Sequence, residues 1–188
     1  EFNYVSIELR VDPVVPTKIS VVSSARAARP RASGRTACPF CPGNEGETPP
    51  AVLAVVREGE RFVFKREKEG ERLEDWIVRI FPNKYPILST ESIDCYGYHE
   101  VLVETPVHER HPPDMELEEL ELVFRAALRR LGEMAKDDRV EQIFAFRNYG
   151  ALGGASISHP HSQLVAFSFV PPLIVEELEH SERIGTCP

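Results

Sequence analysis

Short apolar segments that stop at proline, glycine or charged residues dominate the first half of the chain. Segments of this length and composition are typical of β-strands. The segments AVLAVV (51–56) and RFVFK (61–65) flank the sequence REGE and predict a β-hairpin. Further strands are predicted at 4–10, 17–23, 75–81 (DWIVRIF) and 99–105 (HEVLVET).

The second half of the chain contains the one long helical pattern, within residues 111–138. Asp114 follows two prolines and is the predicted N-cap, and the glutamates after it favour the positive end of the helix dipole. One apolar stripe recurs at helical spacing and is predicted to lie in the core: Leu117, Leu120, Phe124, Ala127, Leu128 and Leu131. The segments that follow predict strands at 142–148 and 159–170 and a final helix starting near 173–180.

The predicted fold class is α+β, with a mainly antiparallel sheet and one long helix. Strands outnumber helices in the pattern, and most connections are short enough to join antiparallel neighbours. We expect a single domain over residues 1–188. The segment 25–50 is rich in Arg, Pro and Gly and shows no periodicity, so it is predicted to be a loop that carries functional residues.

Composition and charge argue against several classes of function. The net charge is −8 and no long basic run is present, which disfavours nucleic-acid binding because that requires a positive face. No segment has the length and apolar character of a membrane span, and no signal-peptide pattern is present. Four cysteines, two of them in a CxxC pair, favour metal or redox chemistry and a cytoplasmic location over a disulfide framework.

The CxxC pair, Cys38 and Cys41, predicts a metal site. Two intervening residues allow both thiolates to reach one tetrahedral ion, whereas a redox pair would be expected at the start of a helix rather than in a Pro/Gly loop. The remaining ligands should be histidines. His108 follows a strand end and His159 lies in a dense polar cluster, and these are two of six candidates that also include His99, His111, His161 and His180.

The polar cluster is the stretch HPHSQ, residues 159–163. Alternation along a strand would place His159, His161 and Gln163 on one face, and Pro160 would place the stretch at a sheet edge or bulge. Both histidines could be metal ligands, the face could be ordinary, or His159 could bind metal while His161 acts as a nucleophile. The preceding loop favours the third interpretation, because its glycines and neutral donors could cradle a phosphate: Asn148, Gly150, Gly153, Gly154, Ser156 and Ser158.

The sequence resembles the galactose-1-phosphate uridylyltransferase family, a branch of the histidine-triad superfamily. The matching stretches occur in the family's order: ARAARP (25–30), CPFCPGN (38–44), FPNKYPIL (81–88), HEVLVETPVH (99–108) and NYGALGGASISHPHSQ (148–163). The resemblance covers nearly all of the chain but only the N-terminal half of a typical member, so a C-terminal half is expected to be absent. It implies a histidine-triad-like half-barrel with a zinc-bearing loop at 36–50 and a homodimer.

The resemblance also implies a role for each matching residue. The zinc ligands would be Cys38, Cys41, His108 and His159. His161 would attack the α-phosphorus of a nucleoside-diphosphate sugar and form a covalent nucleotidyl-histidine, giving ping-pong transfer to a second sugar phosphate. Phosphate contacts are implied for Asn148, Gly154, Ser156 and Gln163, a nucleotide or sugar-phosphate contact for Arg26 and Arg29, and a nucleoside-side contact for Asn83.

The expected activity is UDP-glucose–hexose-1-phosphate (galactose-1-phosphate) uridylyltransferase. Ser162 stands where many uridylyltransferases have glycine, and HPHSQ with GGAS also resembles the plant-type ADP-glucose–phosphate adenylyltransferases of the family. That activity is the first alternative, and a hydrolase or phosphorylase of dinucleoside polyphosphates is another. A zinc-stabilised nucleotide-binding module without turnover is the non-enzyme alternative.

Overall fold

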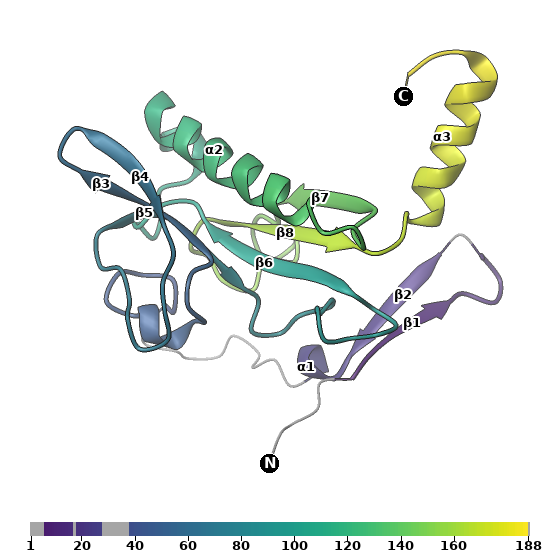
Figure 1. Ribbon diagram of the computed structural model, residues 1–188, viewed down its shortest axis with the longest axis horizontal. Helices are drawn as coiled ribbons and strands as arrows, with labels where there is room; N and C mark the ends of the chain where they lie inside the picture. Colours follow the sequence, from purple (N-terminus) through teal and green to yellow (C-terminus); the bar gives the residue numbers. More distant parts are fainter. Residues whose placement is uncertain (1–5, 17, 28–37, 188) are drawn as a thin grey trace.

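The computed structural model describes residues 6–16, 18–27 and 38–187, without the side chains of residues 26 and 27 (Figure 1). A six-stranded antiparallel sheet in the order β4-β3-β5-β6-β8-β7 forms its centre. These strands are β3 (Leu53–Glu58), β4 (Arg61–Lys65), β5 (Trp76–Pro82), β6 (Gly97–Val103), β7 (Gln142–Phe146) and β8 (His161–Phe167). A separate antiparallel hairpin consists of β1 (Ile7–Val11) and β2 (Ile19–Ser23).

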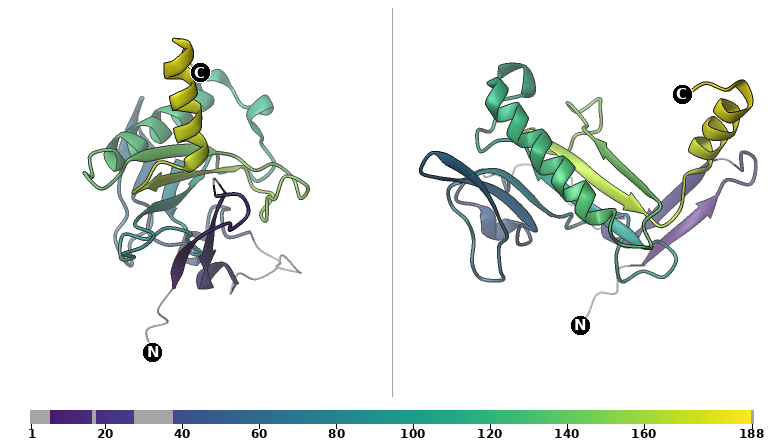
Figure 2. Two further views of the ribbon diagram at one scale, coloured as in Figure 1. Left: turned by 90° about the vertical axis from the view of Figure 1, so that its right-hand side faces the viewer. Right: turned by 45° about the horizontal axis from the view of Figure 1, so that its top comes forward.

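The helices are few and one is long, so the predicted α+β class is confirmed. The long helix α2 (Leu117–Met134) lies across one face of the sheet, and the loop 38–50 lies on the other (Figures 1 and 2). The remaining helices are α1 (Ser24–Ala27), α3 (Pro172–Ile184) and two 3₁₀ turns, η1 (Glu45–Glu47) and η2 (Pro112–Asp114). Within the described ranges, no helix is long and apolar enough to cross a bilayer.

The main core lies between α2 and the sheet. Alternate residues of the central strands, such as Val78, Leu102 and Leu164, are at most 1% exposed and face the helix. Their neighbours along each strand point to the opposite face, where Val101 and Val103 pack with Phe40 of the loop. This two-sided burial explains the uninterrupted apolar segments VLV (101–103) of β6 and LVAF (164–167) of β8.

The predicted apolar stripe of α2 is wrong. Leu117, Phe124 and Leu128 are 81%, 64% and 68% exposed, while the helix face against the sheet is formed by Leu122, Ala126 and Met134. Two stripes on α2 satisfy helical spacing, and spacing alone does not say which of them meets the sheet. Only Ala127 and Leu131 of the predicted set pack, partly buried, against the core.

The predicted N-cap of α2 is also wrong. Asp114 ends the 3₁₀ turn η2, and Glu116 caps α2 instead. Glu116 and Glu119 form a capping box in which the Glu119 carboxylate accepts from the Glu116 backbone N–H at 2.8 Å. The two prolines begin the 3₁₀ turn and so delay the start of the α-helix.

The environments of Leu122 and Leu128 on α2 predict different effects of truncation on the free energy of unfolding. Leu122→Ala should lower the free energy of unfolding by about 2–5 kcal/mol, because it opens a cavity under a side chain that is 3% exposed. Leu128→Ala on the exposed side should change it by less than about 0.5 kcal/mol. Urea denaturation of both variants tests this, and a comparable loss in Leu128→Ala would mean that its face is covered in solution.

Candidate active site

Four side chains from three separate segments form a cluster suited to a metal ion. The ligand atoms of Cys38, Cys41, His108 and His159 all lie within 4.8 Å of one another. The Cys41 Sγ is 3.2 Å from His108 Nδ1 and 3.6 Å from His159 Nδ1. Donors around a tetrahedral zinc lie about 3.3–3.8 Å apart, given typical Zn–S and Zn–N bond lengths. The donor set and its spacing therefore fit one tetrahedral ion.

The protein around the cluster orients both imidazoles. The buried His159 donates from Nε2 to the Thr105 carbonyl at 2.7 Å, so Nδ1 carries the lone pair on the side of Cys41. His108 Nε2 lies 2.9 Å from Ser158 Oγ, which leaves its Nδ1 on the cysteine side as well. Such outer contacts fix the tautomer of metal-binding histidines.

Burial acts on the pKa values of the cluster. It lowers the pKa of His159 to about 4, so the ring is neutral near pH 7, as metal binding requires. Burial, with the neighbouring Cys38 as the next cause, raises the pKa of the Cys41 thiol to about 11. A metal ion would have to displace that thiol proton, which thiolate-binding ions such as zinc do.

The cysteine loop is attached to the sheet by contacts that do not involve the cluster. The buried Glu45 accepts hydrogen bonds from Trp76 Nε1 at 2.8 Å and from the Gly43 backbone at 3.2 Å. At the far end of the loop, Arg79 donates to Thr48 Oγ1 at 2.6 Å and to the Pro49 carbonyl. The loop is therefore held over the face of the sheet that presents His161.

His161 is the first residue of β8 and lies outside the four-ligand cluster. Its Nδ1 is 2.8 Å from the carbonyl oxygen of His159, and because a carbonyl only accepts, Nδ1 carries the proton. The neutral ring then has its lone pair on Nε2, the atom that a nucleophilic imidazole needs. The Phe40 ring packs edge-on against it, with centroids 5.3 Å apart.

Pro160 lies at a local sheet edge, as expected: β8 lies between β6 and β7, but β7 pairs only with residues 163–167 of β8. Pro160 precedes the strand, and its carbonyl accepts from the Glu104 backbone at 3.1 Å. The pairing of β7 ends at Gln163, so the missing N–H of the proline breaks no ladder bond.

Ser162 points to the opposite side of the strand from His161. Its hydroxyl donates to the buried Glu104 carboxylate at 2.6 Å. The Arg147 Nε lies 3.0 and 3.1 Å from the two oxygens of the same carboxylate. Ser162 therefore belongs to a buried polar link between β8 and the end of β7.

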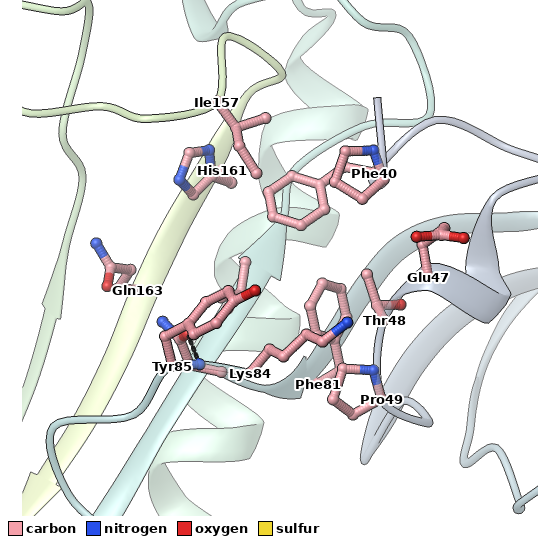
Figure 3. Close-up of a pocket in the computed structure, with 13 residues that line it drawn as sticks. Phe40, Glu47, Thr48, Pro49, Phe81, Lys84, Tyr85, Ile157, His161 and Gln163 are labelled. Carbon is pink, nitrogen blue, oxygen red and sulfur yellow. Dashed lines mark hydrogen bonds between the residues drawn. The ribbon is translucent and has the colours of Figure 1, made fainter. Parts of the chain in front are cut away.

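A cavity opens in front of His161 (Figure 3). The walls of this cavity are both apolar and polar, and the polar groups include His161, Gln163 and Asn83. The lining residues are Pro39, Phe40, Glu47, Thr48, Pro49, Phe81, Asn83, Lys84, Tyr85, Val101, Ile157, His161 and Gln163.

A second cavity lies beside the glycine-bearing loop and is also lined by His161. Asn148 lines it too, and Gly154 has a left-handed φ of +81°; a side chain at this position would place its Cβ 3.5 Å from Asn148 Nδ2. Ser156 Oγ is buried without a hydrogen-bond partner among the described residues. Its neighbours Ala155 and Ile157 line this cavity, whereas Ser156 itself lines neither cavity.

Sequence comparison identifies the family. A family model described as domain of unknown function (DUF4931) N-terminal domain matches residues 64–170. The chain belongs to this family. It is also 30% identical to the ADP-glucose phosphorylase of Arabidopsis thaliana, over 97% of this chain and 56% of that protein. It is 32% identical to the galactose-1-phosphate uridylyltransferase of Thermotoga maritima, over 89% of this chain and 49% of that protein.

Solved structures of such enzymes have a similar fold. The crystal structure of the Arabidopsis thaliana ADP-glucose phosphorylase with bound ADP-glucose matches with a TM-score of 0.65 and 32% identity, covering 97% of this chain and 56% of that one. A uridylyltransferase structure matches with a TM-score of 0.66 and 27% identity, covering 94% and 50%. The chain spans about half the length of these relatives. The resemblance to the N-terminal half of the galactose-1-phosphate uridylyltransferase family is therefore confirmed.

Most predicted site residues meet around His161, and two fall outside what the structure describes. Arg29 lies outside the described residues, and Arg26 belongs to α1 but its side chain is not described. The sequence did not reveal the apolar wall residues of the first cavity, Phe40, Phe81 and Val101, because an apolar residue that faces a cavity has the same pattern along the chain as one that faces the core. From the sequence, His99 is only one of six candidate metal ligands, and the structure places this residue outside the ligand cluster, on the cavity face of β6.

Proposed function

We propose that this protein is a nucleotidyltransferase that acts on a nucleotide sugar through a covalent nucleotidyl-histidine at His161. One observation carries the proposal: His161 lines both cavities, and its Nδ1 is fixed by the His159 carbonyl. A nucleophile at that junction has room for a nucleotide on one side and for a leaving group on the other. Membership of the N-terminal half of a family of nucleotidyl-transferring enzymes supports the same reaction.

The proposed reaction has two similar half-steps. The Nε2 lone pair of His161 attacks the α-phosphorus, the bond from phosphorus to the bridging oxygen breaks, and a sugar 1-phosphate leaves with that electron pair. The acceptor phosphate then attacks the same phosphorus and releases the imidazole. The leaving phosphate is already a stable anion, so the main requirement is hydrogen bonding to the phosphoryl oxygens. Gln163, Asn148 and Ser156 are proposed to supply it.

The metal is proposed to be zinc, held by Cys38, Cys41, His108 and His159. Four protein ligands would fill a tetrahedral shell, so the ion would act as a structural cross-link rather than a Lewis acid. Its effect on the reaction would be indirect. The carbonyl that orients His161 belongs to His159, so fixing His159 also fixes the nucleophile.

Two substrate pairs are proposed. The first is UDP-glucose with a hexose 1-phosphate, in line with the Thermotoga maritima relative. The second is ADP-glucose with phosphate, favoured by the Arabidopsis thaliana relative, whose structure contains ADP-glucose. A homodimer and a cytoplasmic location, without nucleic-acid partners, remain predictions.

The decisive experiment is covalent labelling. The protein is incubated separately with UDP-glucose and ADP-glucose carrying a labelled α-phosphate, denatured, and tested for label at His161 that is stable in base and labile in acid, as a phosphoramidate is. The nucleotide sugar that labels the protein faster shows whether the site prefers uridine or adenosine. If neither nucleotide labels the protein but nucleotide binding is measurable, the protein would be a metal-stabilised nucleotide-binding module without turnover and not an enzyme.

A further inference from the structure

His99 is a buried histidine on the cavity side of the sheet that takes no part in the metal cluster. It is 5% exposed, and its Nδ1 accepts a hydrogen bond from the Ile87 backbone N–H at 3.0 Å. A backbone N–H only donates, so Nδ1 is unprotonated and the ring proton of the neutral imidazole is on Nε2. That nitrogen lies 2.8 Å from Gln163 Oε1 and donates to it.

The strand register brings these two side chains together. Gln163 of β8 lies opposite Val101 of β6, and His99 is two residues before Val101 on the same face. His99 is thus the diagonal cross-strand neighbour of Gln163, within reach of a long side chain. The contact follows from the pairing of the two central strands and does not depend on a loop.

This hydrogen bond decides which end of the Gln163 amide faces the substrate. With the oxygen held by His99, the amide nitrogen lies on the His161 side, as Figure 3 shows. An amide turned by 180° would present its oxygen to the phosphoryl group, and two acceptors would then face each other. We propose that His99 is a positioning residue that holds Gln163 as a hydrogen-bond donor for the reacting phosphate; this rests on the proposed function.

The same tautomer affects Asn83, which also lines the cavity. The Asn83 Oδ1 accepts from the Tyr85 backbone at 2.9 Å, so its Nδ2 is the atom 3.1 Å from His99 Nε2. Both of these nitrogens are donors, so the Asn83 amide hydrogens need an acceptor other than this ring. Gln163, oriented by His99, and Asn83, oriented by the Tyr85 backbone, therefore both offer amide donors, which suits a ligand rich in acceptor oxygens.

Two substitutions of His99 distinguish the contribution of its Nδ1 contact from that of its Nε2 contact. In His99→Asn the short amide reaches the Nδ1 position, and its oxygen can still accept from Ile87. In His99→Gln the longer amide reaches the Nε2 position and can still donate to Gln163. Single-turnover labelling of His161 should fall by about 10–100-fold in His99→Asn, the usual range for residues that orient a functional ligand, and by clearly less in His99→Gln. Equal losses in variants of equal thermal stability would overturn the proposal.

A double-mutant cycle tests whether His99 acts through Gln163. If it does, adding His99→Asn to Gln163→Ala should cause little further loss, whereas fully additive losses would overturn the proposal. Nitrogen-15 NMR of the His99 ring provides a readout that needs no turnover: the proton is expected on Nε2, and finding it on Nδ1 would overturn the proposal. A wild-type protein with this tautomer that never labels His161 would contradict the proposed function instead.

Discussion

Replacing His161 by alanine is expected to lower the rate of nucleotidyl-protein formation by at least about 10⁴-fold, as removal of a nucleophile does in other covalent enzymes. The fold and the metal content should persist. His161 lies outside the ligand cluster, and truncating it enlarges existing cavities instead of opening a new one in the core. The lost bond to the His159 carbonyl should cost about 1 kcal/mol of stability.

Three measurements on His161→Ala test this expectation: single-turnover labelling, bound metal and the thermal midpoint. His180→Ala is the matched control, because His180 is an exposed histidine on α3, remote in the chain from β8. It should label like the wild type. Full labelling of His161→Ala would show that another residue is the nucleophile. Loss of metal from this variant would show that His161 is a metal ligand.

The sequence was most informative where chemistry requires a fixed spacing. Two residues between Cys38 and Cys41 restrict the pair to few structures, and alternation along HPHSQ correctly separated Ser162 from His161 and Gln163. The strands of the main sheet were predictable for a similar reason, since each apolar run is bounded by residues that end strands. These features are local, so a sequence can display them.

Features that depend on partners in space could not be predicted. Both stripes of α2 have helical spacing, and only the sheet beneath selects Leu122 over Leu128. The cavity wall joins Phe40 to Phe81 and Val101, which come from three separate segments. The role of His99 depends on its tautomer, which is set by the backbone N–H of Ile87 in a loop twelve residues earlier. None of these relations appears as a pattern along the chain.

Replacing Cys38 by alanine is expected to lower the stability of the protein strongly. If the substitution weakens metal binding about 1,000-fold, the stability contributed by saturating metal falls by about 4 kcal/mol. The protein should not unfold completely, because Glu45 and Arg79 attach the loop to the sheet without the metal. We therefore expect a folded protein with little bound metal, a lower urea midpoint and slower labelling of His161, since the His159 carbonyl loses its support.

A chelator separates the metal contribution from that of the thiol itself. EDTA should lower the urea midpoint of the wild type towards that of Cys38→Ala and leave the variant unchanged, because both then lack the cross-link. Cys187→Ala removes an exposed thiol outside the cluster and should respond to EDTA like the wild type. If Cys38→Ala retained its metal, or if EDTA destabilised it as much as the wild type, the four residues would not be the ligand set. The support of His161 through His159 would then have to come from the Thr105 hydrogen bond alone.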